Sequence, residues 1–155
     1  MAFRPLRLIV LLFWAFWLTV VTASNVTNGL RVAGALPTSF AFASANFELV
    51  EATTAIYHAP RGVVWVLFLG VIAWEAVAAG LFWRAALAAW RERSVAPGAT
   101  ATAPLLPAFA TALGLFAAFM LADELLIAYA LQATHMRAFI ALGVSWLVVR
   151  PPAAV

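Results

Sequence analysis

Residues 63–83 read VVWVLFLGVIAWEAVAAGLFW and contain a single charged side chain, Glu75. A helix needs about 20 mostly apolar residues to cross the hydrocarbon core of a bilayer, so this stretch is long enough for one crossing. Across all 155 residues, 66% are hydrophobic and 10% are charged, whereas soluble domains carry about 25% charged residues. We therefore expect an integral membrane protein and not a soluble domain.

Three further apolar segments, at residues 8–23, 105–130 and 133–149, are expected to cross the membrane as helices. No internal repeat stands out along the chain. The sequence thus predicts an all-α fold in which residues 1–155 form a single transmembrane domain, a bundle of four helices.

The first apolar segment has a second interpretation. Arg4 and Arg7 precede it and small residues follow it, which is also the profile of a cleavable secretory signal peptide. The apolar stretch is about as long as a spanning helix and contains Trp14 and Trp17. We therefore expect it to be retained as a helix.

Two polar connections separate the first three spans. Residues 25–61 form an expected outer loop, and residues 91–103, with a proline and a glycine, read as a cytoplasmic linker. Within the outer loop, one face of a short helix would carry Phe47, Val50, Thr54 and Tyr57. This spacing predicts an amphipathic helix at the membrane interface, and an ordered loop is the alternative.

The arginines predict the orientation of the chain. All nine basic residues are arginine, and cytoplasmic loops of membrane proteins carry an excess of positive charge. With the N-terminus inside, the cytoplasmic arginines are Arg4, Arg7, Arg84, Arg91, Arg93 and Arg150. The outer ones are Arg31, Arg61 and Arg137. The excess predicts that both termini are cytoplasmic.

Small residues recur along three of the predicted spans. Helices in a bilayer associate through close packing of small side chains and through polar contacts. A four-residue repeat forms a stripe of Ala110, Gly114, Ala118 and Ala122, and shorter pairs are Ala76 with Gly80 and Ala141 with Ser145. We expect the stripe to be a packing seam, against a helix of this chain or of another. The alternative is that alanine is simply abundant here.

Glu75 lies near the middle of the second span, where an acidic side chain costs roughly 2.5–3.5 kcal/mol on insertion scales. It should face protein or trapped water and not lipid. One interpretation is a carboxylate that binds a proton or a cation, as in very small multidrug transporters that work through one membrane-embedded glutamate. The other is a structural glutamate hydrogen-bonded to a neighbouring helix.

A second acidic point is the pair Asp123 and Glu124 near the outer end of the third span. Arg137 enters the fourth span at a comparable depth, so an ion pair that clamps this hairpin is expected. A polar pathway from this cluster to Glu75 is the alternative.

The remaining chemistry is sparse. His58 and His135 are both expected near the outer face, where a pair of histidines could ligate a haem or, with Met136, a copper ion. The chain has no cysteine, no glycine-rich phosphate loop and no HExxH motif. We expect a non-enzymatic protein with no cofactor, and its few flanking arginines do not form a nucleic-acid surface.

Several short patches are similar to one known family. They are Asn25-Val26-Thr27-Asn28, Asn46-Phe47-Glu48-Leu49-Val50, Trp74-Glu75, Asp123-Glu124 and Arg137-Ala138-Phe139. In these the chain resembles an uncharacterised family of bacterial proteins described only as small integral membrane proteins with four spans. Where that family often has an aromatic pair and then Trp-Gln, this chain has Leu125-Leu126 and Tyr129 to Leu131. The resemblance implies the fold and a bacterial inner-membrane location, and no chemistry.

Three functions remain open. We expect first an accessory or stabilising subunit of a larger membrane complex, which contacts lipid and either other subunits or a second copy of itself. The second is a small proton-coupled transporter built around Glu75, and the third is an electron-transfer subunit that uses His58 and His135. A transporter needs Glu75 in a water-reachable cavity, an electron carrier needs converging histidines, and an accessory subunit needs neither.

Overall fold

The computed structural model describes residues 3–91 and 104–150, which are helical apart from their connections. The elements are α1 (Phe3–Val32), α2 (Asn46–Thr54), the 3-10 helix η1 (Ala55–Tyr57), α3 (Arg61–Arg91), α4 (Leu105–Leu125) and α5 (Tyr129–Val149). Three helices, over Pro5–Val32, Arg61–Arg91 and Leu105–Leu125, are long and apolar enough to cross a membrane. The predicted all-α membrane protein is confirmed at this level. The predicted linker lies outside the described residues beyond Arg91.

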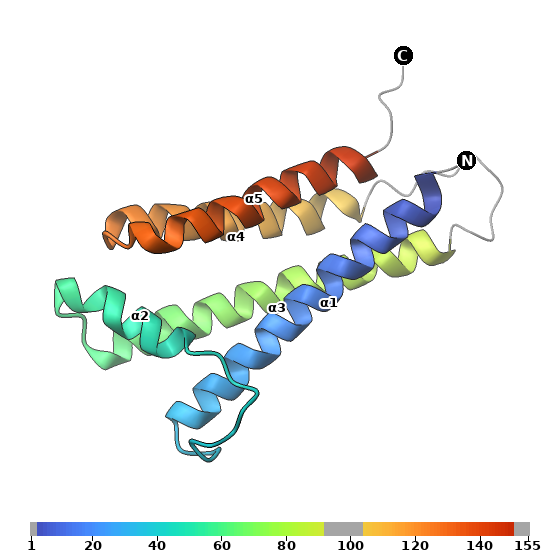
Figure 1. Cartoon of the computed structure of the whole chain (residues 1–155). Helices are drawn as coiled ribbons and strands as arrows, with labels where there is room; N and C mark the ends of the chain where they lie inside the picture. The colour runs from blue at the N-terminus through green and yellow to red at the C-terminus, as the bar shows by residue number, and fades with distance from the viewer. Residues whose placement is uncertain (1–2, 92–103, 151–155) are drawn as a thin grey trace.

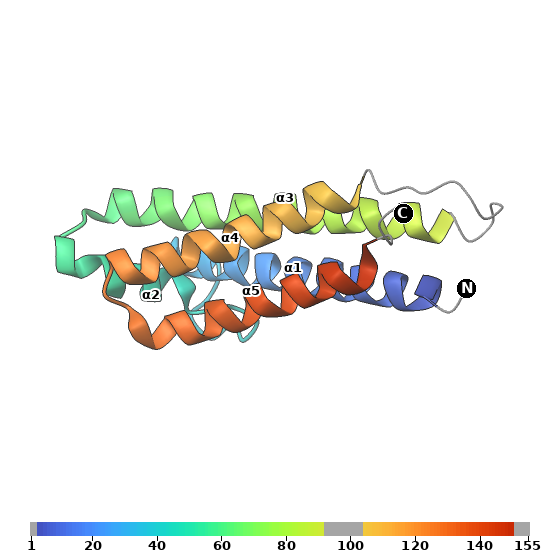
Figure 2. The same ribbon diagram turned by 90° about the horizontal axis from the view of Figure 1, so that it is seen from above.

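The helices form two antiparallel pairs, α1 with α3 and α4 with α5 (Figure 1). The hairpin of α4 and α5 packs on the first pair mainly through α4 and α3. The two views show α2 and the α4–α5 turn at one end of the molecule, opposite the start of α1 (Figures 1 and 2). The short helix α2 folds back against α3 and α1, so the two pairs and α2 enclose the space between them.

Alanines let α1 approach α3 closely. The buried face of α3 carries Ala78, Ala85 and Ala86, and α1 sets Leu11 and Leu18 against it. Large aromatic rings fill the gap to the second pair, and Phe82 meets Phe109 edge-on at 5.0 Å between ring centroids. The main core therefore combines close helix contact on one side with aromatic filling on the other.

The first helix is longer than the sequence predicted. It continues through the Asn-Val-Thr-Asn stretch to Val32, so residues 25–32 belong to α1 and not to the outer loop. The helix ends where Gly34 adopts a left-handed conformation (φ 78°) and the amide of Ala35 donates to the carbonyl of Leu30. This is the Schellman pattern that satisfies the last carbonyls of a helix. Residues 25–32 were predicted as a loop because they are polar. In the structure, hydrogen bonds with the following segment satisfy their polar side chains.

The third predicted span, by contrast, ends earlier than the sequence predicted. α4 ends at Leu125, not at residue 130, and α5 begins at Tyr129, not near residue 133. Ile127 has a φ of 53°, and the amide of Ala128 donates to the carbonyl of Asp123 at 2.7 Å. This is again a Schellman turn, with isoleucine where glycine is usual. Because the sequence lacks that glycine, it did not show where α4 ends.

The predicted seam of small residues is not the buried face of α4. Ala110 is exposed, Ala118 and Ala122 are half-buried, and a Cβ added at Gly114 would lie 3.4 Å from the ring of Trp74. The buried alanines of α4 are Ala108 and Ala112, which share a face with the large core rings. The spacing of the small residues did not show which face of α4 is buried, because alanine is common on every face of the helix.

The two shorter pairs of small residues are also mostly exposed. Ala76 and Gly80 are exposed, and a Cβ added at Gly80 would meet nothing within 4 Å. Ala141 is exposed, whereas Ser145 accepts a hydrogen bond from Trp14 Nε1 at 3.0 Å. Packing of these exposed positions against another chain stays a prediction.

Candidate functional site

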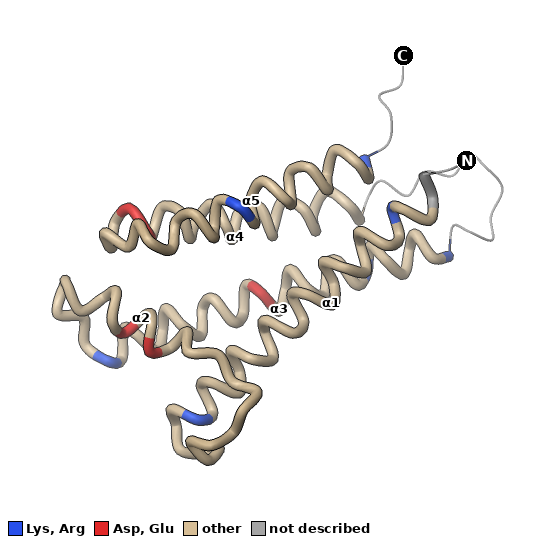
Figure 3. The backbone as a smooth tube through the Cα atoms, in the orientation of Figure 1, with Lys and Arg blue, Asp and Glu red and all other residues tan. Residues whose placement is uncertain are grey.

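A partly open cavity of about 270 Å³ lies between the two helix pairs. All five α-helices contribute to its wall, and most of the lining is apolar. Its polar lining residues are Asn25, Asn46, Thr53, Glu75, Asp123, Thr134 and His135. Figure 3 shows that α3 carries one acidic position far from either of its ends, and this residue, Glu75, reaches the cavity. The cavity brings together two acidic groups that the sequence placed on separate helices.

Glu75 is buried, with a relative exposure of 4%, which agrees with the expectation that it faces protein. Its Oε2 accepts a hydrogen bond of 2.8 Å from Nδ2 of Asn25 on α1. Its Oε1 makes no hydrogen bond to another described residue. The carboxyl group is thus anchored by one oxygen and has the other available to a ligand in the cavity.

Asn25 is the centre of a small hydrogen-bond network. Its Oδ1 accepts from Ser44 Oγ and from Asn46 Nδ2, both at 2.7 Å. Since Oδ1 is occupied as an acceptor, the amide is oriented with Nδ2 toward Glu75. Asn25 is 1% exposed, so these three bonds satisfy a polar group that has no access to water. Through this network, a single residue of α1, Asn25, binds both the start of α2 and the carboxyl group of Glu75.

A second asparagine, one turn further along α1, ties down the rest of α2. The Oδ1 of Asn28 accepts from the backbone amide of Phe47 at 2.8 Å, and its Nδ2 donates to Glu48 at 2.9 Å. Arg31 adds an ion pair to Glu48 at 3.2 Å. Partial burial raises the pKa of Glu48, but the hydrogen bonds from Asn28 and Arg31 outweigh burial and hold it below 4.5. The side chains of α1 therefore serve as a platform for α2.

The end of the cavity beside the α4–α5 turn holds a dyad of Asp123 and His135. Oδ2 of Asp123 lies 2.6 Å from Nδ1 of His135, and the carboxyl group is buried. The imidazole ring packs on Phe119 at 4.8 Å between centroids. Glu124 has a separate partner, because it accepts from Gln132 Nε2 at 2.6 Å.

The predicted ion pair of Asp123 or Glu124 with Arg137 is wrong. Among the described residues Arg137 pairs with neither, and its side chain is exposed. Two residues along an α-helix turn the side chain by about 200°. With His135 facing α4, Arg137 therefore points away from it. The expected hairpin clamp exists, but histidine and glutamine supply it.

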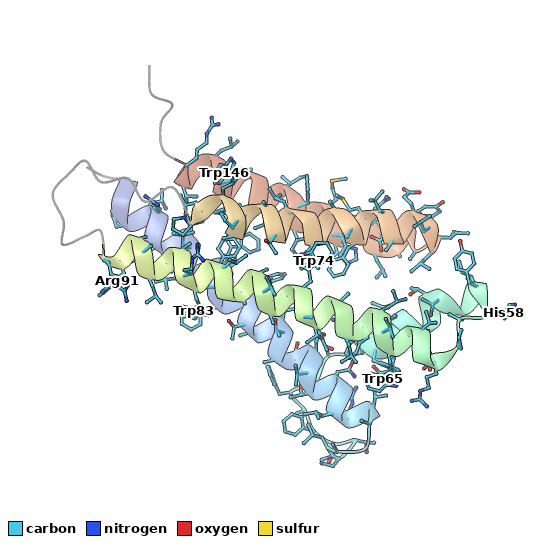
Figure 4. All side chains as sticks on the ribbon, turned by 180° about the vertical axis from the view of Figure 1, so that it is seen from behind. His58, Trp65, Trp74, Trp83, Arg91 and Trp146 are labelled. Atoms are coloured by element: carbon cyan, nitrogen blue, oxygen red, sulfur yellow. The ribbon has the colours of Figure 1, made fainter. Side chains whose placement is uncertain are left out.

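The two histidines do not share a site. His135 lines the cavity, whereas His58 is exposed in a left-handed turn after η1. Figure 4 shows His58 at the tip of the molecule, pointing away from the helices. The weakest alternative, a haem or metal ion held between the two histidines, is not supported, since it requires both rings to converge. Within residues 3–91 and 104–150, no group of three or more His, Asp or Glu residues is placed to hold a metal ion.

Aromatic rings surround the polar groups of the cavity. Trp17, Phe68, Phe116 and Phe119 all line it. Rings attract cations through their electron-rich faces, most strongly where water is excluded. A mostly apolar cavity with two carboxyl groups is suited to a small cationic or protonatable molecule, and less suited to an anion.

Sequence reasoning found Glu75 and Asp123 but missed Asn25 and the role of His135. The available signal was the pair Asn25 and Asn28, which are one helical turn apart in an otherwise apolar region. Two amides on one helix face are costly in a bilayer unless partners meet them. His135 gave no comparable signal, because its partner depends on where α5 begins.

No protein-family model, curated protein sequence or solved structure matches this chain. The features of the chain that bear on its function are therefore the cavity, Glu75 and the groups that hold it.

Proposed function

We propose that this chain is a bacterial inner-membrane protein that crosses the bilayer four times, with α5 as the fourth span. The 21 residues of α5 rise about 31 Å, which matches the hydrocarbon thickness of a bilayer. Gln132, His135 and Arg137 make its first half more polar than the other spans. Two of these three polar side chains have partners within the chain, since Gln132 and His135 form hydrogen bonds with residues of α4.

In this arrangement α2 lies at the outer membrane interface and both termini are cytoplasmic, as the distribution of arginines favours. Cysteine substituted for exposed Ser39, in the loop before α2, is expected to react with an impermeant thiol reagent in intact spheroplasts. Cysteine substituted for Ala99, in the expected cytoplasmic linker, should stay unlabelled. The opposite pattern would reverse the orientation.

Within this membrane frame, the proposed function is that of a small, non-enzymatic, proton-coupled carrier that uses Glu75. The observation that supports it is the cavity, because a carboxyl group with one anchored and one available oxygen faces a space lined by aromatic rings. This is the feature that separates a carrier from an accessory subunit. A proton and a cationic substrate compete for the same carboxylate in such a site, so binding of one releases the other.

The size of the cavity restricts the substrate. Its volume of about 270 Å³ equals the liquid volume of about nine water molecules. Drug-sized ligands occupy sites of about 300–1,000 Å³. The proposed substrate is therefore a small, largely apolar monocation or amine.

An accessory subunit is the second candidate. It is favoured by the exposed small residues Ala76 and Gly80 on α3, which leave space for a helix of another protein or of a second copy. Such a role makes no use of the available oxygen of Glu75. Recovery of a stoichiometric partner that is lost in Gly80→Leu, without any transport, would favour this candidate.

The carrier is tested with benzyltrimethylammonium, a small aromatic monocation whose charge does not change with pH. Full-length protein in liposomes should take up the probe when protons are driven the opposite way. Its neutral carbon analogue, neopentylbenzene, controls for partition into lipid. Glu75→Gln keeps the shape and most hydrogen bonding of the side chain but cannot exchange a proton, so uptake should fall at least about tenfold.

The matched control is Glu51→Gln. Glu51 lies on α2 outside the cavity lining and is half-exposed beside Arg61. This substitution removes the same charge and should leave uptake unchanged. Uptake that survives Glu75→Gln in a folded protein, or no uptake by the parent, would overturn the proposal.

A further inference from the structure

We propose that Asp123 and His135 form a second proton-binding site, which exchanges protons with Glu75 through the cavity they share. This inference rests on the proposed carrier function and adds the route by which protons reach its carboxylate. It starts from the geometry of the dyad at the outer end of the cavity.

The contact with Asp123 determines which ring nitrogen of His135 is available. At 2.6 Å a proton lies between Oδ2 of Asp123 and Nδ1 of His135, and in this proposal Asp123 is ionised and accepts it from Nδ1. In the neutral ring Nε2 then carries the lone pair, and no described residue donates to it. Since His135 lines the cavity, Nε2 is the proton acceptor at this end. A carboxylate behind Nδ1 also stabilises the ring when Nε2 takes up a proton.

The surroundings favour a ring that changes its charge. When protonated, His135 pairs with the buried carboxylate of Asp123 and stacks on Phe119, whose face attracts a cation. The side chain of His135 keeps a relative exposure of 23% and lies in the first two turns of α5, which in the proposed orientation are near the outer face. No arginine lines the cavity to compete for Asp123.

The other charged or titratable groups near the dyad are Tyr57, Glu124, Tyr129 and Arg137, and none of them lines the cavity. On α4, Glu124 is held by Gln132, and the η1 residue Tyr57 donates its hydroxyl to the carbonyl of Leu125. Arg137 of α5 lies on the opposite side of the helix, and no charged residue of α1 or α2 lines the cavity. Glu75 on α3 is thus the one other carboxyl group that shares the cavity with the dyad among the described residues.

Glu75 and the dyad are at different depths. Trp74, beside Glu75, packs on Gly114 and donates a hydrogen bond to the carbonyl of Thr111. From Gly114 to Asp123, α4 rises by about 13 Å. A direct transfer over that distance is excluded, but the cavity has the volume of about nine waters. A short water chain is therefore the required connection.

The transfer conserves protons at each step. Nε2 takes a proton from outer water and becomes an N–H of an imidazolium paired with Asp123. It then donates that proton to cavity water, and a proton from the same chain binds to Oε1 of Glu75. The ring returns to its neutral form, Glu75 becomes a neutral carboxylic acid, and a bound cation loses its counter-charge.

The test uses the full chain labelled with ¹⁵N-histidine in lipid nanodiscs. Only two histidines are present, so exposed His58 serves as an internal control and His58→Gln assigns the signals. Long-range ¹H–¹⁵N spectra should show His135 as the Nδ1–H tautomer, which is the minor form in water. His58 should show the ordinary Nε2–H tautomer.

Coupling to Glu75 is read from the same spectra. Two sites that interact through one cavity titrate together, so Glu75→Gln should move the titration midpoint of His135. The midpoint of His58 should not move, and Glu51→Gln should move neither. Asp123→Asn keeps an oxygen that accepts from Nδ1, so the tautomer should persist.

The outcomes separate the two proposals. An Nε2–H tautomer in the parent, or a His135 curve that ignores Glu75→Gln, would overturn the second proton site even if cation uptake depends on Glu75. A coupled His135 curve without any uptake of benzyltrimethylammonium would support the site and overturn the carrier.

Discussion

Removal of the Asn25 side chain is the most informative perturbation of this fold. Asn25→Ala breaks the bond to Glu75 at 2.8 Å and the two bonds from Ser44 and Asn46 at 2.7 Å. Hydrogen bonds between transmembrane helices contribute about 0.6 kcal/mol on average and up to about 1.7 kcal/mol. Three such bonds predict a loss of about 2–5 kcal/mol in the free energy of unfolding.

The matched control is Asn46→Ala, which removes only one of the three bonds. Its expected loss is about 0.6–1.7 kcal/mol, roughly a third of the effect of Asn25→Ala. Both values can be measured by SDS titration of the protein in mixed micelles, followed by tryptophan fluorescence. Trp17 lines the cavity and reports on its opening. Equal losses for the two variants would refute the central role of Asn25.

Three other substitutions test separate parts of the fold. Ile127→Gly relieves a left-handed isoleucine that is 63% exposed, and should raise the free energy of unfolding by about 1 kcal/mol in the same titration. The pKa of Glu48 is lowered from 4.5 in the folded protein, so its contribution is present above pH 4.5 and is lost as the pH falls further. Hydrogen exchange in α2 should therefore accelerate below that pH, and Glu48→Gln should remove the dependence. A Cβ at Gly29 would lie 3.2 Å from Phe68 Cε1. Gly29→Leu should thus cost about 1–3 kcal/mol by overpacking, whereas Gly70→Leu, with open space around it, should cost little.

The second span illustrates which features can be predicted from the sequence alone. An apolar run such as residues 63–83 has no stable place in water, and the structure has one helix, Arg61–Arg91, across it. The burial of Glu75 followed from the same reasoning, because a carboxyl group in lipid is costly. These conclusions depend only on the free energy of transfer from water to lipid, which each segment carries by itself.

The partners of the polar groups did not follow from the sequence. The phase of α5 relative to α4 depends on a three-residue turn that ends α4 with Ile127 in place of a glycine. A change of two residues in that phase exchanges His135 for Arg137 as the neighbour of Asp123. Opposite charge predicted arginine as the partner of Asp123, but the geometry of the turn places histidine beside it.

The cavity is a property of the tertiary structure alone. By itself the chain determined that its long apolar helices belong in a membrane and that Glu75 needs a partner or a space. Only the packing of α1, α2 and the α4–α5 hairpin decided that Glu75 has both, an amide from Asn25 and a cavity shared with His135. Transfer free energies are local sums over a segment, whereas hydrogen-bond partners depend on the relative rotation and depth of helices far apart in sequence.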